Sequence, residues 1–230
     1  MSLKLWIGLA MVVGLVGCRP TPAVANKHLY EACAAKNLSD VKQAIAEGAD
    51  VNLSLRDEDF RYSPLEAAVQ SPEIVEALLK AGAAPKKADA RGLFPLGMAA
   101  AAGDTKSVEL ILKWGALLEG KDADGETALA RAAGAGKLEN AKFLVNCGAN
   151  VNAKDRLGYT PLFHAVIGPM LSSLDRTEMA RFLIDHGANI AIIDNKGRTA
   201  ANYAQSTFAR PTGATQALID LLTNPVPKLE

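Results

Sequence analysis

Three histidines are the residues best suited to acid–base or metal chemistry in this chain of 230 residues. His28, His164 and His186 lie far apart in the sequence. His186 directly precedes Gly187 at the end of an apolar helical pattern, where the helix dipole stabilises a charged imidazole. His164 has no nucleophile or carboxylate at a useful sequence spacing. The pattern predicts no catalytic residue, no metal site and no cofactor.

Two cysteines, Cys33 and Cys147, raise the question of a disulfide or a reactive thiol. Cys33 stands where a small buried residue is expected, and Cys147 directly precedes a glycine that ends a helical pattern. The two belong to repeat units three apart, beyond the Cα separation of about 7 Å that a disulfide permits. We expect both to be unpaired structural thiols that are buried or react slowly.

A phosphate-binding loop or a nucleophile elbow would be the other sources of chemistry. Gly134-Ala135-Gly136-Lys137 lacks the leading glycine and the following Ser or Thr of a P-loop, and no nucleophile elbow is found. The 25 basic and 25 acidic side chains balance, which gives no reason to expect nucleic acid as a partner. The sequence therefore predicts neither an enzyme nor a small-molecule substrate.

The N-terminus has the pattern of a secretory signal. Lys4 precedes an apolar segment, Leu5 to Gly17, of 13 residues, which is shorter than the roughly 20 that span a bilayer. Leu15-Val16-Gly17-Cys18 resembles the lipobox of bacterial lipoproteins, in which cleavage precedes the cysteine and its sulfur is acylated. Cleavage near Ala23 or Ala25, without a lipid, and a buried N-terminal helix are the alternatives.

The lipobox resemblance implies a lipid anchor on Cys18 and a periplasmic location. Arg19 follows the cysteine, and not the Asp that in enterobacteria favours retention in the inner membrane. The resemblance therefore favours the outer membrane.

One helix–turn–helix pattern repeats along the rest of the chain. The glycines that end the second helices are 34, 33, 33 and 39 residues apart: Gly48, Gly82, Gly115, Gly148 and Gly187. The residues that start the first helices are 31, 33, 33 and 39 apart: Pro64, Pro95, Ala128, Pro161 and Ala200. Hydroxyl N-caps are expected at Ser63, Thr127, Thr160 and Thr199, whereas Phe94 offers none.

The repeat resembles the ankyrin repeat from Lys27 to Thr223. The resemblance is carried by Ser63-Pro64-Leu65, Thr160-Pro161-Leu162, Asp124-Gly125-Glu126-Thr127, Gly48-Ala49-Asp50-Val51-Asn52 and Gly148-Ala149-Asn150-Val151-Asn152. Its period near 33 is that of the family. The histidine of the family's Thr-Pro-Leu-His motif is replaced by Glu66, Gly97, Ala130, Phe163 and Asn202, so the usual Thr–His bond is not expected.

The resemblance implies an all-α ankyrin-repeat solenoid of about six helix-turn-helix units joined by β-hairpin-like loops. We expect a signal peptide at 1–17, a lipidated, flexible or polyproline-like tether at 18–26, the repeat domain at 27–225 and a tail at 226–230. The first and last units are expected to act as polar caps on a monomer.

Two departures from the regular spacing add length. The hairpin that contains Asp57–Tyr62 is three residues longer than later ones, and about six residues are inserted around Gly168–Asp175. Connections in a solenoid tolerate added length and often bind partners. Drift without function is the alternative for both.

Ankyrin repeats bind proteins through hairpin tips and the exposed side of the first helices. The family's variable positions, with the neighbouring first-helix residues, map to Phe60, Arg61, Tyr62, Arg91, Leu93, Asp124, Glu126, Arg156, Tyr159, Phe163, His164, Lys196 and Arg198. Aromatic residues and arginine dominate interface energies. We expect these residues to contact a partner protein, unless the loops are simply solvated.

Two functions remain open. The chain resembles immunity proteins that bind and neutralise secreted antibacterial effectors, including lipases, and a membrane anchor would place it where such effectors act. It also resembles periplasmic ankyrin proteins associated with catalase activity and peroxide resistance, which would make it a scaffold or accessory protein.

Overall fold

The computed structural model describes residues 20–53, 62–89, 92–168, 172–207 and 213–224. Within these residues the regular structure consists of twelve helices, and no strand is present. The helices are α2 (Pro22–Ala34), α3 (Leu38–Ala46), α4 (Pro64–Ala67), α5 (Pro72–Lys80), α6 (Pro95–Ala102), α7 (Thr105–Lys113), α8 (Ala128–Gly134), α9 (Leu138–Asn146), α10 (Pro161–Ile167), α11 (Ser173–Asp185), α12 (Ala200–Thr207) and α13 (Gly213–Thr223). The predicted all-α solenoid is confirmed.

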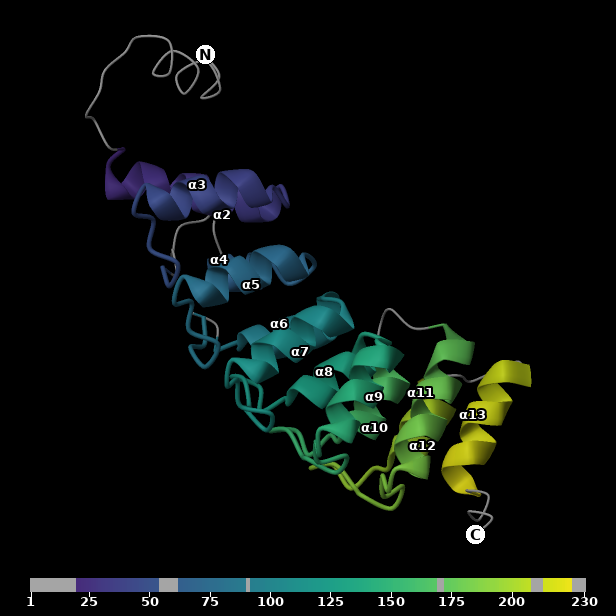
Figure 1. Ribbon diagram of the computed structural model, residues 1–230. Helices are drawn as coiled ribbons and strands as arrows, with labels where there is room; N and C mark the ends of the chain where they lie inside the picture. Colours follow the sequence, from purple (N-terminus) through teal and green to yellow (C-terminus); the bar gives the residue numbers. More distant parts are fainter. Residues whose placement is uncertain (1–19, 54–61, 90–91, 169–171, 208–212, 225–230) are drawn as a thin grey trace.

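The described helices form six pairs that are stacked in a curved row (Figure 1). The first helices α6, α8, α10 and α12 contact one another in sequence order, and so do the second helices α3, α5, α7 and α9. The loops that join one pair to the next lie along one edge of the row (Figure 1). The described loop tips follow one another along this edge.

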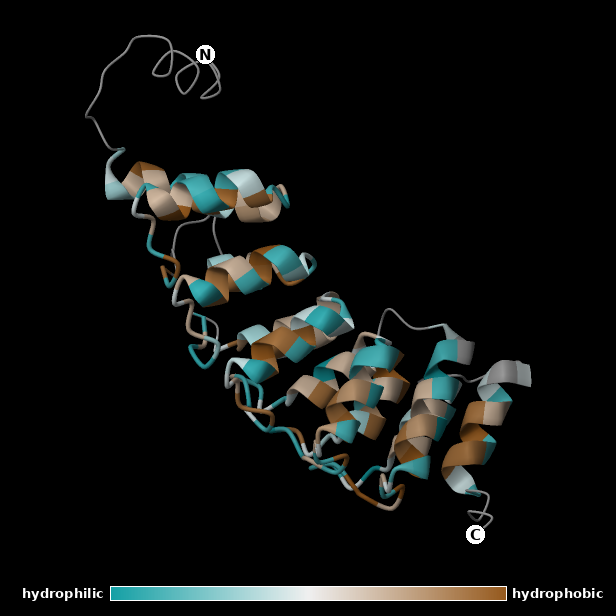
Figure 2. Cartoon of the chain, viewed as in Figure 1, coloured by the Kyte–Doolittle hydropathy of each residue, from teal (hydrophilic) through white to brown (hydrophobic). Residues whose placement is uncertain are grey.

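The hydrophobic core runs between the two layers of helices along the whole row. The leucine at the second position of α4, α6, α8 and α10 is almost fully buried: Leu65, Leu96, Leu129 and Leu162 are 1–2% exposed. Apolar residues of the second helices, such as Leu78, Ile111 and Leu144, face them from the other layer. Hydrophilic and hydrophobic residues alternate around the second helices α3, α5, α7 and α9 (Figure 2), so these helices bury one face and expose the other. The first helices α6, α8 and α10 are buried or half-buried throughout.

The first helices are capped in different ways. Ser63 and Glu66 form a capping box, in which each side chain accepts a hydrogen bond from the other residue's backbone amide. Asn202 and Thr199 do the same at α12. Glu66 and Asn202 therefore stabilise this turn at the position of the missing family histidine. Thr127 caps α8 as predicted, whereas the prediction was wrong for Thr160, whose side chain makes no capping bond.

The five second helices with a predicted stop glycine each end at that glycine, which has a left-handed backbone. Gly48, Gly82, Gly115, Gly148 and Gly187 have φ between 91° and 95°. A Cβ atom at Gly148 would meet no atom within 4 Å, so the backbone conformation alone requires glycine there. The local sequence therefore determines where these helices stop.

An aspartate shapes each described loop tip. Asp122, Asp155 and Asp194 each accept hydrogen bonds through Oδ1 from the amides two and four residues later, at 2.8–3.0 Å. Asp89 accepts one from Leu93 at 2.9 Å. In each tip the aspartate amide also donates to the carbonyl four residues later. The tips are hairpin-like turns, as predicted, but they are built around aspartates that the sequence interpretation did not single out.

The predicted tether at 18–26 was wrong for residues 22–26. These residues form the start of α2, and Ala25 is fully buried. Pro22 occupies the first helical turn, where proline needs no amide partner and has the right φ. The structure thus extends the first repeat unit toward the N-terminus; residues 18 and 19 lie outside the described residues.

Both cysteines are free, but they differ in exposure. Cys33 is fully buried, and burial raises the pKa of its thiol to about 12. Cys147 is exposed, so burial does not hold for it, and its expected slow reactivity stays a prediction. It is the C-cap of α9, and its backbone, not its side chain, makes the helix-ending contacts. Cys33 alone is a buried structural thiol.

The added length near residue 170 lies partly in a helix. Ser172 and Asp175 form a capping box at the start of α11, which has 13 residues where α9 has nine. The expectation of an addition confined to the connection was therefore wrong for Ser173–Asp175. Residues 169–171 lie outside the described residues, as does the extended hairpin except for Tyr62.

The two ends of the row carry polar faces. In α13, Leu218, Leu221 and Leu222 are buried, whereas Gln216 and Asp220 are exposed. In the first unit, Asn37 caps α3 by accepting bonds from the amides of Ser39 and Asp40. No helix among the described residues is long and apolar enough to cross a membrane.

Candidate protein-binding surface

The expected contact residues divide into three groups. Phe60, Arg61 and Arg91 lie outside the described residues. Leu93 and Phe163 are 5% and 1% exposed, so their prediction as contact residues was wrong. The other eight are exposed or half-buried: Tyr62, Asp124, Glu126, Arg156, Tyr159, His164, Lys196 and Arg198.

Leu93 and Phe163 are buried for local reasons. Leu93 is the last residue of its loop tip, and its amide donates a buried bond to Asp89. Phe163, in α10, stacks on Tyr159 with the ring centroids 5.3 Å apart. Both are core residues. An apolar residue in a first helix or at the end of a loop tip therefore cannot be assigned to partner binding from its position alone.

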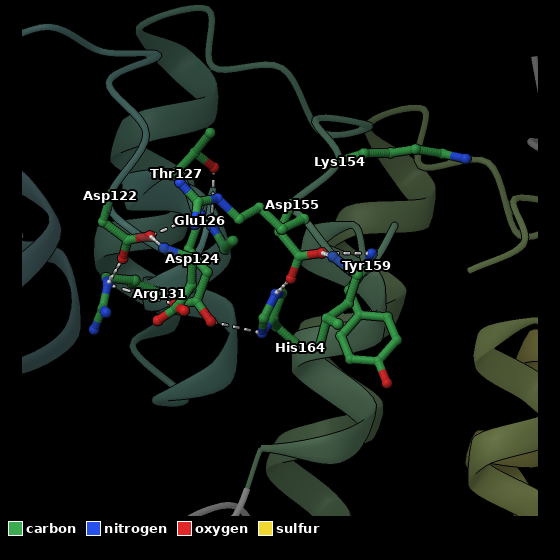
Figure 3. Close-up of polar contacts among 12 residues, drawn as sticks. Asp122, Asp124, Glu126, Thr127, Arg131, Lys154, Asp155, Tyr159 and His164 are labelled. Carbon is green, nitrogen blue, oxygen red and sulfur yellow. Dashed lines mark hydrogen bonds and ion pairs between the residues drawn. The ribbon is translucent and has the colours of Figure 1, made fainter. Parts of the chain in front are cut away.

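Polar side chains from two loop tips gather around His164 (Figure 3). His164 Nε2 lies 3.1 Å from Asp155 Oδ2, and its Nδ1 lies 3.8 Å from Glu126 Oε1. Arg131 Nε lies 2.7 Å from Asp122 Oδ2 and 3.4 Å from the other oxygen of Glu126. The structure therefore brings carboxylates to His164, which the sequence interpretation had left without one.

An aromatic cluster follows on the next units. Tyr159 and Tyr203 share a hydrogen bond of 2.8 Å between their hydroxyls. Tyr203 also donates to Asp194 at 2.7 Å, and the guanidinium of Arg198 lies 4.0 Å from the centre of the Tyr203 ring and contacts its hydroxyl. Tyr159 and Arg198 are thus held in an internal network, and only part of each side chain is available to a partner.

Asp194 anchors this network electrostatically. Burial favours its neutral form, but hydrogen bonds from the amides of Arg198 and Lys196 and the charge of Arg198 outweigh burial and lower the pKa of Asp194. The carboxylate therefore stays ionised and holds the turn through its hydrogen bonds to these two amides.

The most exposed side chains of the last two tips form one surface. We define the tip surface as Lys154, Arg156, Leu157, Ile193 and Lys196, all of which are exposed. The two tips are joined, because the amide of Asn195 donates to the carbonyl of Leu157 at 3.0 Å and Lys154 donates to the carbonyl of Ile193 at 3.2 Å.

The tip surface combines positive charge with aliphatic side chains. Leu157 and Ile193 are 56% and 50% exposed, among the most exposed large hydrophobic residues described. The intervening acids, Asp155 and Asp194, have side chains only 4% and 1% exposed. The sequence interpretation named Arg156 and Lys196 but missed Leu157 and Ile193. An aliphatic residue inside an otherwise polar tip was the available clue.

The sequence was also compared with known protein families and curated proteins. It matches the family described as "Ankyrin repeats (3 copies)" over residues 29–122 and 116–175, and "Ankyrin repeat" over residues 157–195. These ranges together run without a gap over more than half of the chain. No curated protein matches the sequence. The sixth unit, α12 and α13, extends the stack beyond the matched residues.

Proposed function

Because the chain belongs to the ankyrin-repeat family, whose members are protein–protein interaction modules, we propose that it binds another protein through the tip surface. The observation that carries this proposal is the exposure of Leu157 and Ile193 among basic side chains. When a partner covers exposed aliphatic side chains, the binding free energy becomes more favourable by about 25 cal/mol for each Å² of apolar surface removed from water.

The chemistry of the tip surface indicates the kind of partner. Lys154, Arg156 and Lys196 place three exposed positive side chains around the two aliphatic ones. A complementary partner presents carboxylates around a small apolar patch, since opposite charges steer encounter and fix register. The fixed backbone of the joined tips lowers the ordering cost of binding.

A paired comparison tests the tip surface. The double variant Leu157→Ser with Lys196→Glu should weaken partner binding by about 30-fold or more, the effect of removing an interface hot spot. The matched control is Leu117→Ser with Lys42→Glu, which changes a leucine of similar exposure, 53%, and an exposed lysine elsewhere.

The measurement is affinity capture from periplasmic extract with quantitative mass spectrometry. One protein should be retained by the wild type and the control but lost by the tip variant. Equal retention by both variants would place the binding site elsewhere on the stack.

For the biological role, we propose a periplasmic immunity protein, anchored by lipid on Cys18, that neutralises a secreted antibacterial effector such as a lipase. The sequence Leu15-Val16-Gly17-Cys18 supports the lipid anchor, which we assign to the outer membrane. The stack of ankyrin repeats supports inhibition by binding alone, without a catalysed reaction. An anchored inhibitor would meet an effector at the membrane that the effector attacks.

Two experiments test this role. Cys18→Ala should release the protein from membranes or block its processing; membrane association of the variant at mature size would refute the anchor.

Co-expression of this protein should rescue cells from a toxic protein encoded beside its gene, and the double variant of the tip surface should fail to rescue them. A neighbouring gene for a catalase, with loss of peroxide resistance on deletion, would instead support the scaffold function.

A further inference from the structure

The side chains of Glu126, Asp155 and His164 meet at the junction of the fourth and fifth units (Figure 3). Glu126 and Asp155 belong to successive loop tips, and His164 lies in α10. We propose that these three residues bind one divalent transition-metal ion, for which Zn²⁺ is the best fit. The proposal does not depend on the tip surface or on any partner.

The spacing of the donor atoms suits zinc. Zinc bonds of about 2.0–2.2 Å to nitrogen and oxygen place neighbouring tetrahedral ligands about 3.4 Å apart. His164 Nε2 and Asp155 Oδ2 are 3.1 Å apart. One donor atom from each of the three side chains lies within 4.8 Å of the others. Asp155 faces Nε2 of His164, whereas Glu126 faces the other ring nitrogen, Nδ1. Nε2 is therefore the nitrogen that would bind the ion beside Asp155, and the Glu126 side chain must rotate to reach the same ion.

The ligand from Asp155 is held in place before any ion binds. Its Oδ1 accepts bonds of 2.8 Å from the amides of Leu157 and Tyr159, which leaves Oδ2 directed at His164. The His164 and Tyr159 rings pack edge to face, with the centroids 6.0 Å apart. Such outer contacts fix the orientation of metal ligands and raise affinity.

The local charge balance favours a dication. Asp122, Glu126 and Asp155 carry three negative charges, and Arg131 supplies one positive charge. These four side chains together carry a net charge of −2, which one divalent ion neutralises. The side chains of Glu126 and His164 are 23% and 12% exposed, so an ion can enter from solvent.

The ligand set discriminates among metals. Ca²⁺ takes six to eight oxygen ligands, and Mg²⁺ prefers octahedral oxygen and retained water. One imidazole with two carboxylates suits Zn²⁺ and its neighbours in the first transition series. Three protein ligands leave a fourth position toward solvent, which water or a side chain of another molecule would fill.

The test uses the full-length chain, purified in mild detergent and freed of metal with EDTA. At about pH 7.5, where histidine is mostly neutral, titration with Co²⁺ should give one bound ion per chain with the visible bands of four-coordinate cobalt. Zn²⁺ should displace it, with a Kd in the micromolar range or below, and should raise the melting temperature.

Three variants and one control separate this site from adventitious binding. Asp155→Asn keeps an oxygen that can accept hydrogen bonds from the backbone amides of the tip, but it removes the anionic ligand. This variant should weaken Zn²⁺ binding about 100-fold, as should His164→Gln. Glu126→Gln provides a third test at a more exposed position. His186→Gln changes a histidine that bonds only its own helix, at Phe182, and should have no effect.

Any one of three results would overturn the proposal. These are no one-to-one binding, undiminished affinity in the three site variants, or an equal loss of affinity in the His186 control. Melting curves without metal identify variants that fail to fold.

Discussion

At the residue scale, the loop tips depend on carboxylates that are almost fully buried. The side chains of Asp122, Asp155 and Asp194 are 5%, 4% and 1% exposed, and each is satisfied by backbone amides. Buried charges require such bonds, because a carboxylate without them would lose its hydration with no compensation. These aspartates fix the tips, and the tips position both Leu157 and the ligands around His164.

The lowered pKa of Asp194 gives a pH-dependent prediction. Because the folded-state pKa lies below the unfolded value of about 3.9, the carboxylate stabilises the fold above that value. This stabilisation is lost as pH falls through the lower folded-state pKa. Asp194→Asn should therefore be less stable than the wild type at pH 7, and the gap should close in acid.

Urea unfolding monitored by circular dichroism between about pH 7 and pH 2 measures this gap. Asp124→Asn is the control, because Asp124 lies in a loop tip but its side chain is exposed. A gap that stays constant down to the lowest pH would show that the charge of Asp194 does not matter.

Residue exposure was the least predictable property. Phe163 and Leu157 are both apolar residues near the same tip, yet one is 1% and the other 56% exposed. Family position suggested contact for Phe163, whereas its ring packs on Tyr159. The pairing of His164 with Asp155 and Glu126 was also missed. Asp155 and His164 are separated by a turn of the chain, and Glu126 belongs to another repeat.

At the element scale, the helix boundaries follow from local sequence, while the contacts between units depend on side chains that no motif marks. The stop glycines were predictable because a left-handed backbone strongly favours glycine. Asn140 in α9 was not predictable. Its side chain is buried and donates to the carbonyls of Ala99, Ala100 and Gly103 at the end of α6.

Asn140→Ala tests this contact between the third and fourth units. The variant leaves carbonyl oxygens at the end of α6 without their buried donor, so we expect a loss of about 3 kcal/mol in the free energy of unfolding. Asn146→Ala, an exposed position in the same helix, should change it by less than about 0.5 kcal/mol. Equal effects in denaturant titrations would contradict the role of Asn140.

Gly148→Ala tests the helix stop. Its φ of 91° is unfavourable for alanine although the Cβ has space, so we expect a loss of about 1–2 kcal/mol. Gly213→Ala is the control, because Gly213 has no positive φ and its Cβ would also meet no atom within 4 Å. If the two variants melt alike, the conformation at residue 148 is not required.

At the scale of the whole molecule, the stack places unlike surfaces in a fixed order along one edge. Asp124 is exposed at the tip before the fourth unit, and the positive and aliphatic tip surface lies on the last two tips. The number and order of units were predictable from the 33-residue period. Each unit is stabilised by packing on similar neighbours, so the same motif recurs in the sequence. The tip surface required the structure, because two successive tips create it together.

Site-specific photo-crosslinking in intact cells tests the central claim most directly. A photoreactive amino acid is placed at position 157 in one variant and, as a control of similar exposure, at position 117 in another. We predict that position 157 captures a single protein and that position 117 does not. Capture of that protein only from position 117, or equally from both, would contradict binding through the tip surface.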